Sequence, residues 1–222
     1  DGRLWKPFDK EAMVVYSNPR DFSGGAMNES KQQLLHCITQ LANRNVLVIG
    51  DLFLDEYVVG RATRLSREAP IPVLEFVRRF YVPGGAANPA HNICALEGHA
   101  AALGLIGRDE AGTQLISELR RVGIGTSGIV LDDSRPTTTK TRVMAEGSLR
   151  FPQQVARVDS VDRRKMTRRV EAELIAQVKR LVPTVDAVLV SDYQTGVASR
   201  AVIQAALNTG KAQGKLCTAD AQ

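Results

Sequence analysis

The sequence is poor in cysteine, histidine and long apolar runs, and each shortage excludes a class of protein. Three of the 222 residues are cysteines, with no Cys-x-x-Cys spacing, which argues against a disulfide framework or a zinc site. The three histidines lack metal-ligand spacing. No apolar run approaches the ~20 residues that cross a bilayer, and no basic-then-apolar export signal is visible. We therefore expect a cytoplasmic protein with no membrane partner.

Aromatic residues are also scarce, at 5% of the chain, and the charge is only modestly basic, with 29 Lys and Arg against 24 Asp and Glu. The basic cluster at residues 163–169 points around a helix and has no interleaved aromatics for base stacking, so we expect no nucleic-acid partner. The run Gly123–Gly128 matches the dinucleotide fingerprint literally. It follows a helix and precedes a strand, the reverse of what that fingerprint requires.

Strand and helix patterns alternate along most of the chain. Val46–Gly50 is a short β-branched run typical of a strand buried on both faces of a parallel sheet. The alternation predicts an open α/β sheet. Similar apolar runs occur at 101–106, 187–190 and 216–218, and helical patterns at 87–96, 111–122, 164–181 and 199–212. Before them, residues 1–44 are interpreted as an irregular leader and an amphipathic helix over 30–43, and 45–222 as the main domain.

Two segments break the alternation. The pairs Tyr57–Arg64 with Val73–Val82, and Thr138–Met144 with Gln154–Asp159, interleave polar and apolar residues as extended strands do. They predict a second, small antiparallel sheet that stands over one edge of the main body as a lid. Its apolar faces would be too large for a thin flap to cover, which predicts self-association through these strands.

Candidate ligand-binding residues follow the first strand and the first lid hairpin. Asp51 and Asp55 come where open α/β sheets place their ligand crevice, and two carboxylates there can accept hydrogen bonds from sugar hydroxyls. The alternative is that one of them caps a turn or binds a backbone N–H. Gly84 and Gly85 allow close approach to the backbone, and Asn88 follows in the first turn of a helix. A tight strand-to-helix turn would explain the two glycines equally well.

The run Gly84-Gly85-x-x-Asn88-x-Ala90, with Leu105-Ile106-Gly107-x-Asp109-x-x-Gly112 after it, resembles the N-terminal signature of the phosphofructokinase-B (ribokinase-like) sugar kinases. The resemblance extends from about Asn45 to the last residue. Several further strings look like the branch that phosphorylates heptose 7-phosphate for ADP-heptose synthesis: Gly50–Tyr57, Arg64–Pro70, Pro136–Arg142, Gln153–Asp159 and Ser191–Tyr193.

The resemblance implies a ribokinase-like fold, with a mostly parallel sheet, helices on both faces and a protruding β lid. It implies an ATP- and Mg²⁺-dependent kinase acting on a sugar or sugar phosphate, and a homodimer formed through the lid. Asp55 is then the best candidate for a substrate hydroxyl, with Asp51 beside it. Four other residues complete the implied substrate-binding set: Gly84, Gly85, Asn88 and Asp192. Arg64 is either a lid contact to a substrate phosphate or an ordinary solvated charge on a strand.

The chain departs from the heptose-kinase pattern in two places. Gln194-Thr195 stands where that branch has Gly-Lys, and Ala221-Gln222 where it has Pro-Lys, so another sugar or sugar phosphate is equally plausible. The family's Asn-x-x-Glu and Gly-Ala-Gly-Asp segments would come after Gln222. We therefore expect no catalytic base in these residues, a fold that lacks its C-terminal part, and no phosphoryl transfer by the chain alone. The alternative is a non-catalytic sugar-binding or dimerisation module.

Overall fold

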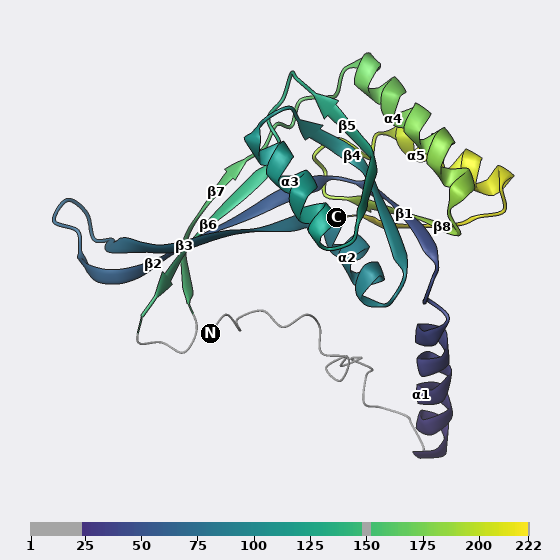
Figure 1. Ribbon diagram of the computed structural model, residues 1–222, viewed down its shortest axis with the longest axis horizontal. Helices are drawn as coiled ribbons and strands as arrows, with labels where there is room; N and C mark the ends of the chain where they lie inside the picture. Colours follow the sequence, from purple (N-terminus) through teal and green to yellow (C-terminus); the bar gives the residue numbers. More distant parts are fainter. Residues whose placement is uncertain (1–23, 148–151, 222) are drawn as a thin grey trace.

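The main body of the protein is a five-stranded parallel sheet (Figure 1). A computed structural model describes residues 24–147 and 152–221, so most of the predicted leader lies outside the described residues. The strands run in the order β5-β4-β1-β8-β9, and each neighbouring pair is parallel. The predicted parallel α/β sheet is confirmed. Its strands are β1 (Asn45–Gly50), β4 (His99–Gly107), β5 (Gly125–Asp132), β8 (Ala187–Asp192) and β9 (Leu216–Ala221).

Helices cover both faces of this sheet, as the resemblance implied (Figure 1). Alternate side chains of a strand point to opposite faces, so Leu47 and Ile49 pack into one core cluster while Val48 packs into the other. The first cluster is completed by α4 (Arg168–Leu181) and α5 (Arg200–Ala212), the second by α2 (Ala87–Ala95) and α3 (Glu110–Arg121). A short 3₁₀ helix, η1 (Val182–Thr184), follows α4.

Two helices begin later than predicted because side chains cap their N-termini. The Thr167 hydroxyl accepts a hydrogen bond from the Val170 N–H, so α4 begins at residue 168 rather than 164. The Ser199 hydroxyl likewise accepts from the Val202 N–H at the start of α5. Ser and Thr favour such capping positions over helix interiors, and this sets both boundaries.

A four-stranded lid projects from one edge of the main body (Figure 1). Its order is β3-β2-β6-β7, and the two hairpins are antiparallel as predicted. The prediction of a wholly antiparallel lid is wrong, because the central β2–β6 pair is parallel. β2 and β6 follow β1 and β5, which are parallel, so both leave the same edge of the main sheet and run outward together. The lid strands are β2 (Leu52–Leu65), β3 (Pro72–Gly85), β6 (Thr139–Glu146) and β7 (Gln153–Ser160).

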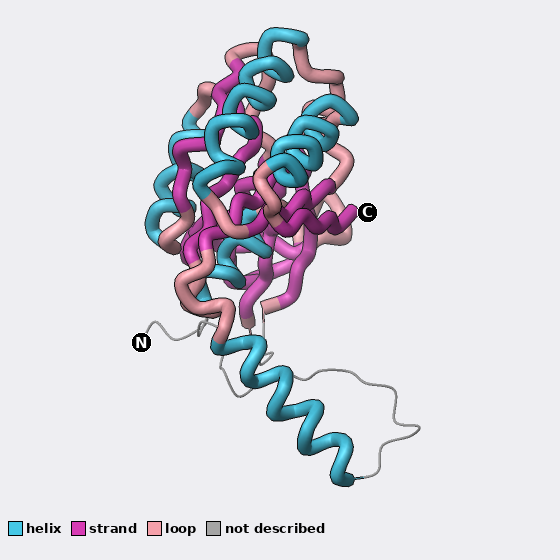
Figure 2. Tube along the Cα trace, turned by 90° about the vertical axis from the view of Figure 1, so that its right-hand side faces the viewer, coloured by secondary structure: helices cyan, strands magenta, loops and turns pink. Residues whose placement is uncertain are grey.

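The N-terminal helix α1 (Gly24–Thr39) projects away from the sheet (Figures 1 and 2). It begins before the predicted capping box at Ser30 and ends before the predicted boundary at Asn43. Asn43 itself adopts a left-handed conformation, with φ of 61°, a conformation in which Asn often ends a helical segment. Leu34 and Leu35 are about half exposed. No helix in residues 24–147 and 152–221 is long and apolar enough to cross a membrane.

Candidate functional site

The candidate site lies where the order of the main sheet reverses. From β1 the chain passes through the first lid hairpin to β4 on one side, and later it returns to β8 on the other side. Open α/β sheets bind ligands at the carboxyl ends of strands beside such a switch point. The candidate crevice is therefore formed by the residues that follow β1 and β8, together with the ends of the lid strands nearest the main sheet.

Asp51, directly after β1, is fully buried and is saturated with backbone hydrogen bonds. Its Oδ2 accepts from the Tyr193 N–H at 2.8 Å and the Thr195 N–H at 3.1 Å, and its Oδ1 accepts from the Val197 N–H at 3.1 Å. This is the alternative foreseen for one of the two aspartates, a carboxylate that binds backbone N–H groups. Asp51 ties the loop after β8 to the end of β1.

Two adjacent glycines bring the root of β3 against these aspartates. Gly85 has a φ of +63°, in the left-handed region that favours glycine, and an added Cβ would collide with the Asp51 carbonyl oxygen. That carbonyl accepts a hydrogen bond from the Ala86 N–H at 2.8 Å. At Gly84 the neighbour is the Asp55 carboxylate, since an added Cβ would lie 2.6 Å from Asp55 Oδ2 and 3.0 Å from its Cγ. Gly85 is therefore required by its backbone conformation and by a backbone contact, whereas the close contact at Gly84 is with the end of the Asp55 side chain.

Asp55 is the carboxylate that the fold brings to the crevice, with a side chain that is 16% exposed. Arg142 on β6 lies beside it, with Nη1 2.7 Å from Oδ1. The guanidinium N–H bonds are not aimed at this oxygen, which is enclosed and has no well-directed hydrogen bond in the described part of the chain. Burial opposes the charge of Arg142, but the neighbouring Asp55 carboxylate raises the pKa of the guanidinium above its usual value.

Lys140 and Arg142 are site residues that the sequence reasoning missed. β2 and β6 pair in parallel register, Asp55 opposite Lys140 and Tyr57 opposite Arg142, so these side chains share one face of the lid. The Lys140 ammonium lies 4.1 Å from the centre of the Phe53 ring, and that ring meets Tyr193 edge to face. The available signal was two cations spaced two residues apart in a predicted lid strand.

The other residues that the sequence analysis named as candidates lie at different distances from Asp55. Asn88 is exposed in the first turn of α2, four residues after Gly84, and no side-chain hydrogen bond is formed by it within the described residues. Asp192 ends β8 and accepts a hydrogen bond from the Gln194 N–H at 2.8 Å. Arg64 is exposed near the lid tip, nine residues along β2 from Asp55, which corresponds to about 30 Å. Within one chain the structure does not bring Arg64 to the site.

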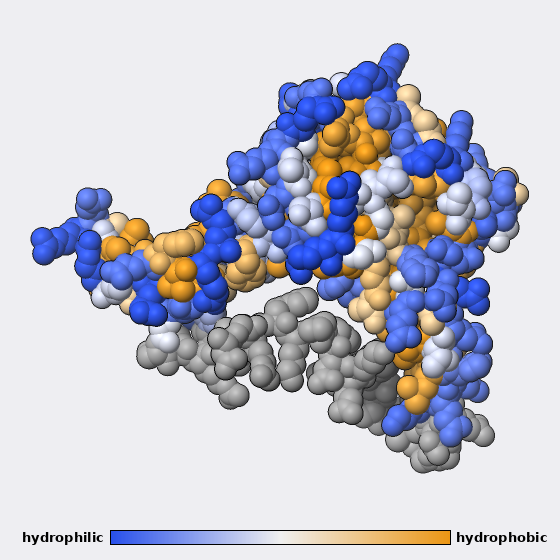
Figure 3. Space-filling model, in the orientation of Figure 1, coloured by the Kyte–Doolittle hydropathy of each residue, from blue (hydrophilic) through white to orange (hydrophobic). Residues whose placement is uncertain are grey.

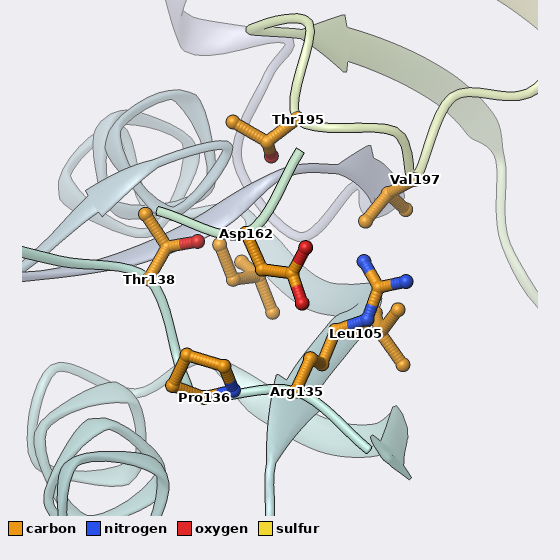
Figure 4. A pocket seen from close by; sticks show the side chains of 8 residues that line it. Leu105, Arg135, Pro136, Thr138, Asp162, Thr195 and Val197 are labelled. Atoms are coloured by element: carbon orange, nitrogen blue, oxygen red, sulfur yellow. The ribbon is translucent and has the colours of Figure 1, made fainter. Parts of the chain in front are cut away.

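A shallow, open hollow lies beside the crevice (Figure 4). The Asp162 carboxylate faces into it between Arg135 and Thr138 (Figure 4). Hydrogen bonds from the Arg164 side chain and backbone lower the pKa of Asp162 to about 2. The other lining residues are Leu52, Leu105, Pro136, Thr195 and Val197. The hollow is thus walled by the lid root and by the loop that Asp51 holds.

A buried ion pair fixes one wall of this hollow. Burial alone would raise the pKa of Asp132, but hydrogen bonds from Ser134 and Arg135 lower it below its usual value. The Arg135 Nε lies 3.0 Å from Asp132 Oδ2, and both side chains are almost fully enclosed. Arg135 is therefore committed to this internal pair.

Comparison with known proteins places the chain in a family. Residues 21–215 match the model of the pfkB family carbohydrate kinases. The protein named "Bifunctional protein HldE" from Azorhizobium caulinodans is 43% identical over 176 residues, which is 79% of this chain and 35% of that protein. The protein of the same name from Helicobacter pylori is 38% identical over 177 residues, 80% of this chain and 37% of that protein. The chain thus spans about a third of the length of these relatives.

Solved structures share the fold at lower identity. Phosphofructokinase-2 from Escherichia coli, in its tetrameric inhibited form, matches with a TM-score of 0.59 and 18% identity, covering 81% of this chain and 55% of that one. A possible 1-phosphofructokinase from Thermotoga maritima matches with a TM-score of 0.59 and 15% identity, covering 80% and 53%. These likenesses confirm the ribokinase-like architecture, and the match over 195 residues, 21 to 215, decides the family. The chain belongs to the pfkB family of carbohydrate kinases.

Proposed function

We propose that this chain forms the sugar-binding part of an ATP-dependent carbohydrate kinase, which transfers the γ-phosphoryl group of ATP to a hydroxyl of a sugar or sugar phosphate. Heptose 7-phosphate is the specific candidate, because the lid motifs resemble that branch of the family. The observation that carries the proposal is the contact of the Asp55 carboxylate with Gly84 at the switch point of the sheet. It leaves a carboxylate at the root of the lid, where we propose that polyol hydroxyls donate to it.

The proposed roles follow from these contacts. Asp55 accepts hydrogen bonds from a substrate hydroxyl, and the exposed Asn88 amide donates and accepts at the rim. Gly84 and Gly85 are proposed to belong to the sugar site because their missing side chains leave room for the Asp55 carboxylate and the Asp51 carbonyl. Asp51 acts indirectly, by holding the loop of residues 193–197. Asp192 in the same crevice is proposed as a further contact. Because Arg64 lies at the lid tip, it reaches a substrate phosphate only across a dimer or after the lid bends.

Magnesium and ATP are proposed from the family. Among residues 24–147 and 152–221, no group of three or more His, Cys, Asp or Glu side chains is arranged to hold a metal ion. We assign Asp55 and its neighbours to the sugar side of the reaction, because they lie together at the root of the lid. Their contribution is positioning, which in phosphoryl transfer supplies a large share of catalysis together with charge stabilisation.

We also propose that the lid mediates a homodimer. Every residue of β7 is exposed, so both faces of this edge strand are open in the single chain. Two large apolar side chains of the lid, Phe76 and Val158, are 66% and 63% exposed, and apolar surface gathers on the lid in Figure 3. An edge strand with open apolar faces favours association with a second copy. Light scattering at tens of micromolar tests this proposal, and a monomer at that concentration would contradict it.

The proposed activity is tested by ATP consumption across a panel of sugars and sugar phosphates, measured on the 222-residue chain and on the full-length natural protein. We expect sugar-dependent turnover by the full-length protein and none by the short chain. Turnover by the short chain would contradict the division of roles. Inactivity of both would favour the non-catalytic binding module. A cytoplasmic location is proposed with the ATP-dependent reaction, and the free thiols of Cys37, Cys94 and Cys217 suit it.

A further inference from the structure

Arg142 lies on the site face of the lid and is held in place from two sides. Its guanidinium carbon is 5.3 Å from the centre of the Tyr57 ring. That ring in turn stacks on Phe80, with centroids 4.8 Å apart and planes inclined by only 2°. On its other side, the Arg142 Nη1 lies 2.7 Å from Asp55 Oδ1. A cation between an aromatic platform and a carboxylate loses little further freedom when a ligand binds, so the pair is pre-organised.

Asp55 is correspondingly confined between two neighbours. Its Oδ2 side is limited by Gly84, where there is no room even for a methyl group, and its Oδ1 is covered by Arg142. The plane of the carboxylate is therefore fixed by a contact on each side. Without the guanidinium, no cation would lie within 4.0 Å of the Asp55 carboxylate in the part of the chain that the structure describes. A buried, unpaired carboxylate oxygen is costly, and the side chain would rotate to recover a partner.

We infer that Arg142 is a positioning residue for sugar recognition: it holds Oδ1, so that Asp55 presents the rest of its carboxylate to the substrate hydroxyl in one orientation. The inference rests on the proposed function. It extends the site to a residue on a different lid hairpin, 87 positions away in the sequence (142 − 55). The parallel β2–β6 pairing makes this contact possible, because it places Arg142 two residues beyond Lys140, the residue opposite Asp55.

The competing role for Arg142 is direct contact with an anionic group of the substrate. Two observations favour positioning instead. The charge of Arg142 is already matched by Asp55 at 2.7 Å, and its side chain is only 20% exposed. Lys140, on the same face, forms no ion pair with any described residue and rests over Phe53, so it is the cation available to an incoming phosphate. The two roles differ in the expected coupling free energy between Arg142 and Asp55 for sugar binding: positioning predicts strong coupling, and direct contact with the substrate predicts independent losses.

A double-mutant cycle on the full-length natural protein separates these roles. Affinity is measured by calorimetry for two probes, heptose 7-phosphate and the same heptose without its phosphate, in Asp55→Asn, Arg142→Gln and the double variant. We expect Arg142→Gln to weaken binding of both probes by about tenfold, because the enclosed Asp55 oxygen loses its partner, and to cause no further loss in the Asp55→Asn background. Arg142→Lys, which keeps the charge but not the planar fork, should recover part of the affinity.

The matched control is Arg157→Gln on β7. Arg157 shares this face of the lid, but pairs with Asp159 at 2.9 Å, and its side chain is 50% exposed. We expect the affinity of the Arg157→Gln variant for both probes to stay within about twofold of that of the unaltered protein, because exposed ion pairs contribute little. Thermal melts of all variants check that each is folded. An additive loss in the cycle, or a loss confined to the phosphorylated probe, would overturn the positioning role.

A ligand-free measurement keeps this inference separate from the proposed function. If the unaltered protein binds neither probe, the proposed substrate is wrong, and the role of Arg142 is then judged on a crystal structure of unliganded Arg142→Gln. We expect the Asp55 carboxylate to leave its place against Gly84 in that variant. A carboxylate that stays in the same orientation without the guanidinium would show that Arg142 does not position it.

Discussion

Gly84→Ala is the substitution that probes the site most selectively. The backbone of Gly84 is not in the left-handed region, so alanine brings no conformational strain there. Its Cβ would lie 2.6 Å from Asp55 Oδ2, whereas ordinary contact begins at 3.4 Å. One of the two groups must therefore move by 3.4 − 2.6 = 0.8 Å. The group that can yield is the Asp55 carboxylate, because Gly84 is part of the paired β2–β3 ladder.

The magnitude follows from that displacement. Moving the Asp55 carboxylate away from the sugar hydroxyl forfeits that hydrogen bond, so we expect sugar binding to weaken by about 1–3 kcal/mol. The added methyl in a packed site should also lower the free energy of unfolding by about 1–3 kcal/mol. Both effects act through one side chain, so Asp55→Ala, which removes the clashing carboxylate, should abolish most of the stability cost of Gly84→Ala.

Calorimetry with heptose 7-phosphate measures the first effect and chemical denaturation the second. Gly147→Ala is the matched control, because an added Cβ there meets nothing within 4 Å and the position lies on the same lid. We expect this control to change neither quantity by more than about 0.5 kcal/mol. A folded Gly84→Ala protein that binds the sugar as tightly as the unaltered one would refute the claim that the place of Asp55 against Gly84 matters for recognition.

Three further outcomes are expected. Asp51→Asn should lower the free energy of unfolding by about 2–3 kcal/mol in denaturant titrations, because an amide nitrogen would face backbone N–H donors; a loss below 0.5 kcal/mol would contradict its structural role. The pKa of Asp162 in the folded state is lowered to about 2. Its contribution to stability is therefore present above its ordinary pKa of 3.8 and is lost as pH falls toward 2. Asp162→Asn should flatten that part of the acid unfolding curve, and an unchanged curve would show that Asp162 does not contribute to stability there. Val158→Lys should convert the proposed dimer to a monomer in light scattering, while a dimer of unchanged stability would place the interface elsewhere.

The fold was predictable to the extent that it depends on local pattern. Runs such as Val46–Gly50 are apolar on both faces, and this marks a strand covered by helices on each side. The pairing of the lid was not predictable in the same way. Interleaved polar and apolar residues indicate extended strands, but whether two hairpins meet through a parallel pair depends on which edge of the main sheet each one leaves.

The geometry of the candidate site was predictable where sequence neighbours are also spatial neighbours. Asp55 and the Gly84-Gly85 turn lie in one hairpin, so their motif and their contact coincide. Asp51 has its partners about 142–146 residues away, and only the folded chain shows that its oxygens are occupied by backbone N–H groups. Arg142 was missed for the same reason, since its partner Asp55 lies on the other lid hairpin.

The most direct test of the proposed sugar site is the affinity of the full-length natural protein for heptose 7-phosphate, measured by calorimetry before and after Asp55→Asn. Asp133→Asn serves as the control, since that carboxylate is 69% exposed and pairs with Arg108 outside the lid. We predict that Asp55→Asn weakens binding by about 1–3 kcal/mol, with little change in the melting temperature, and that the control binds normally. Equal affinities for the unaltered protein and Asp55→Asn would contradict the assignment of Asp55 to the sugar.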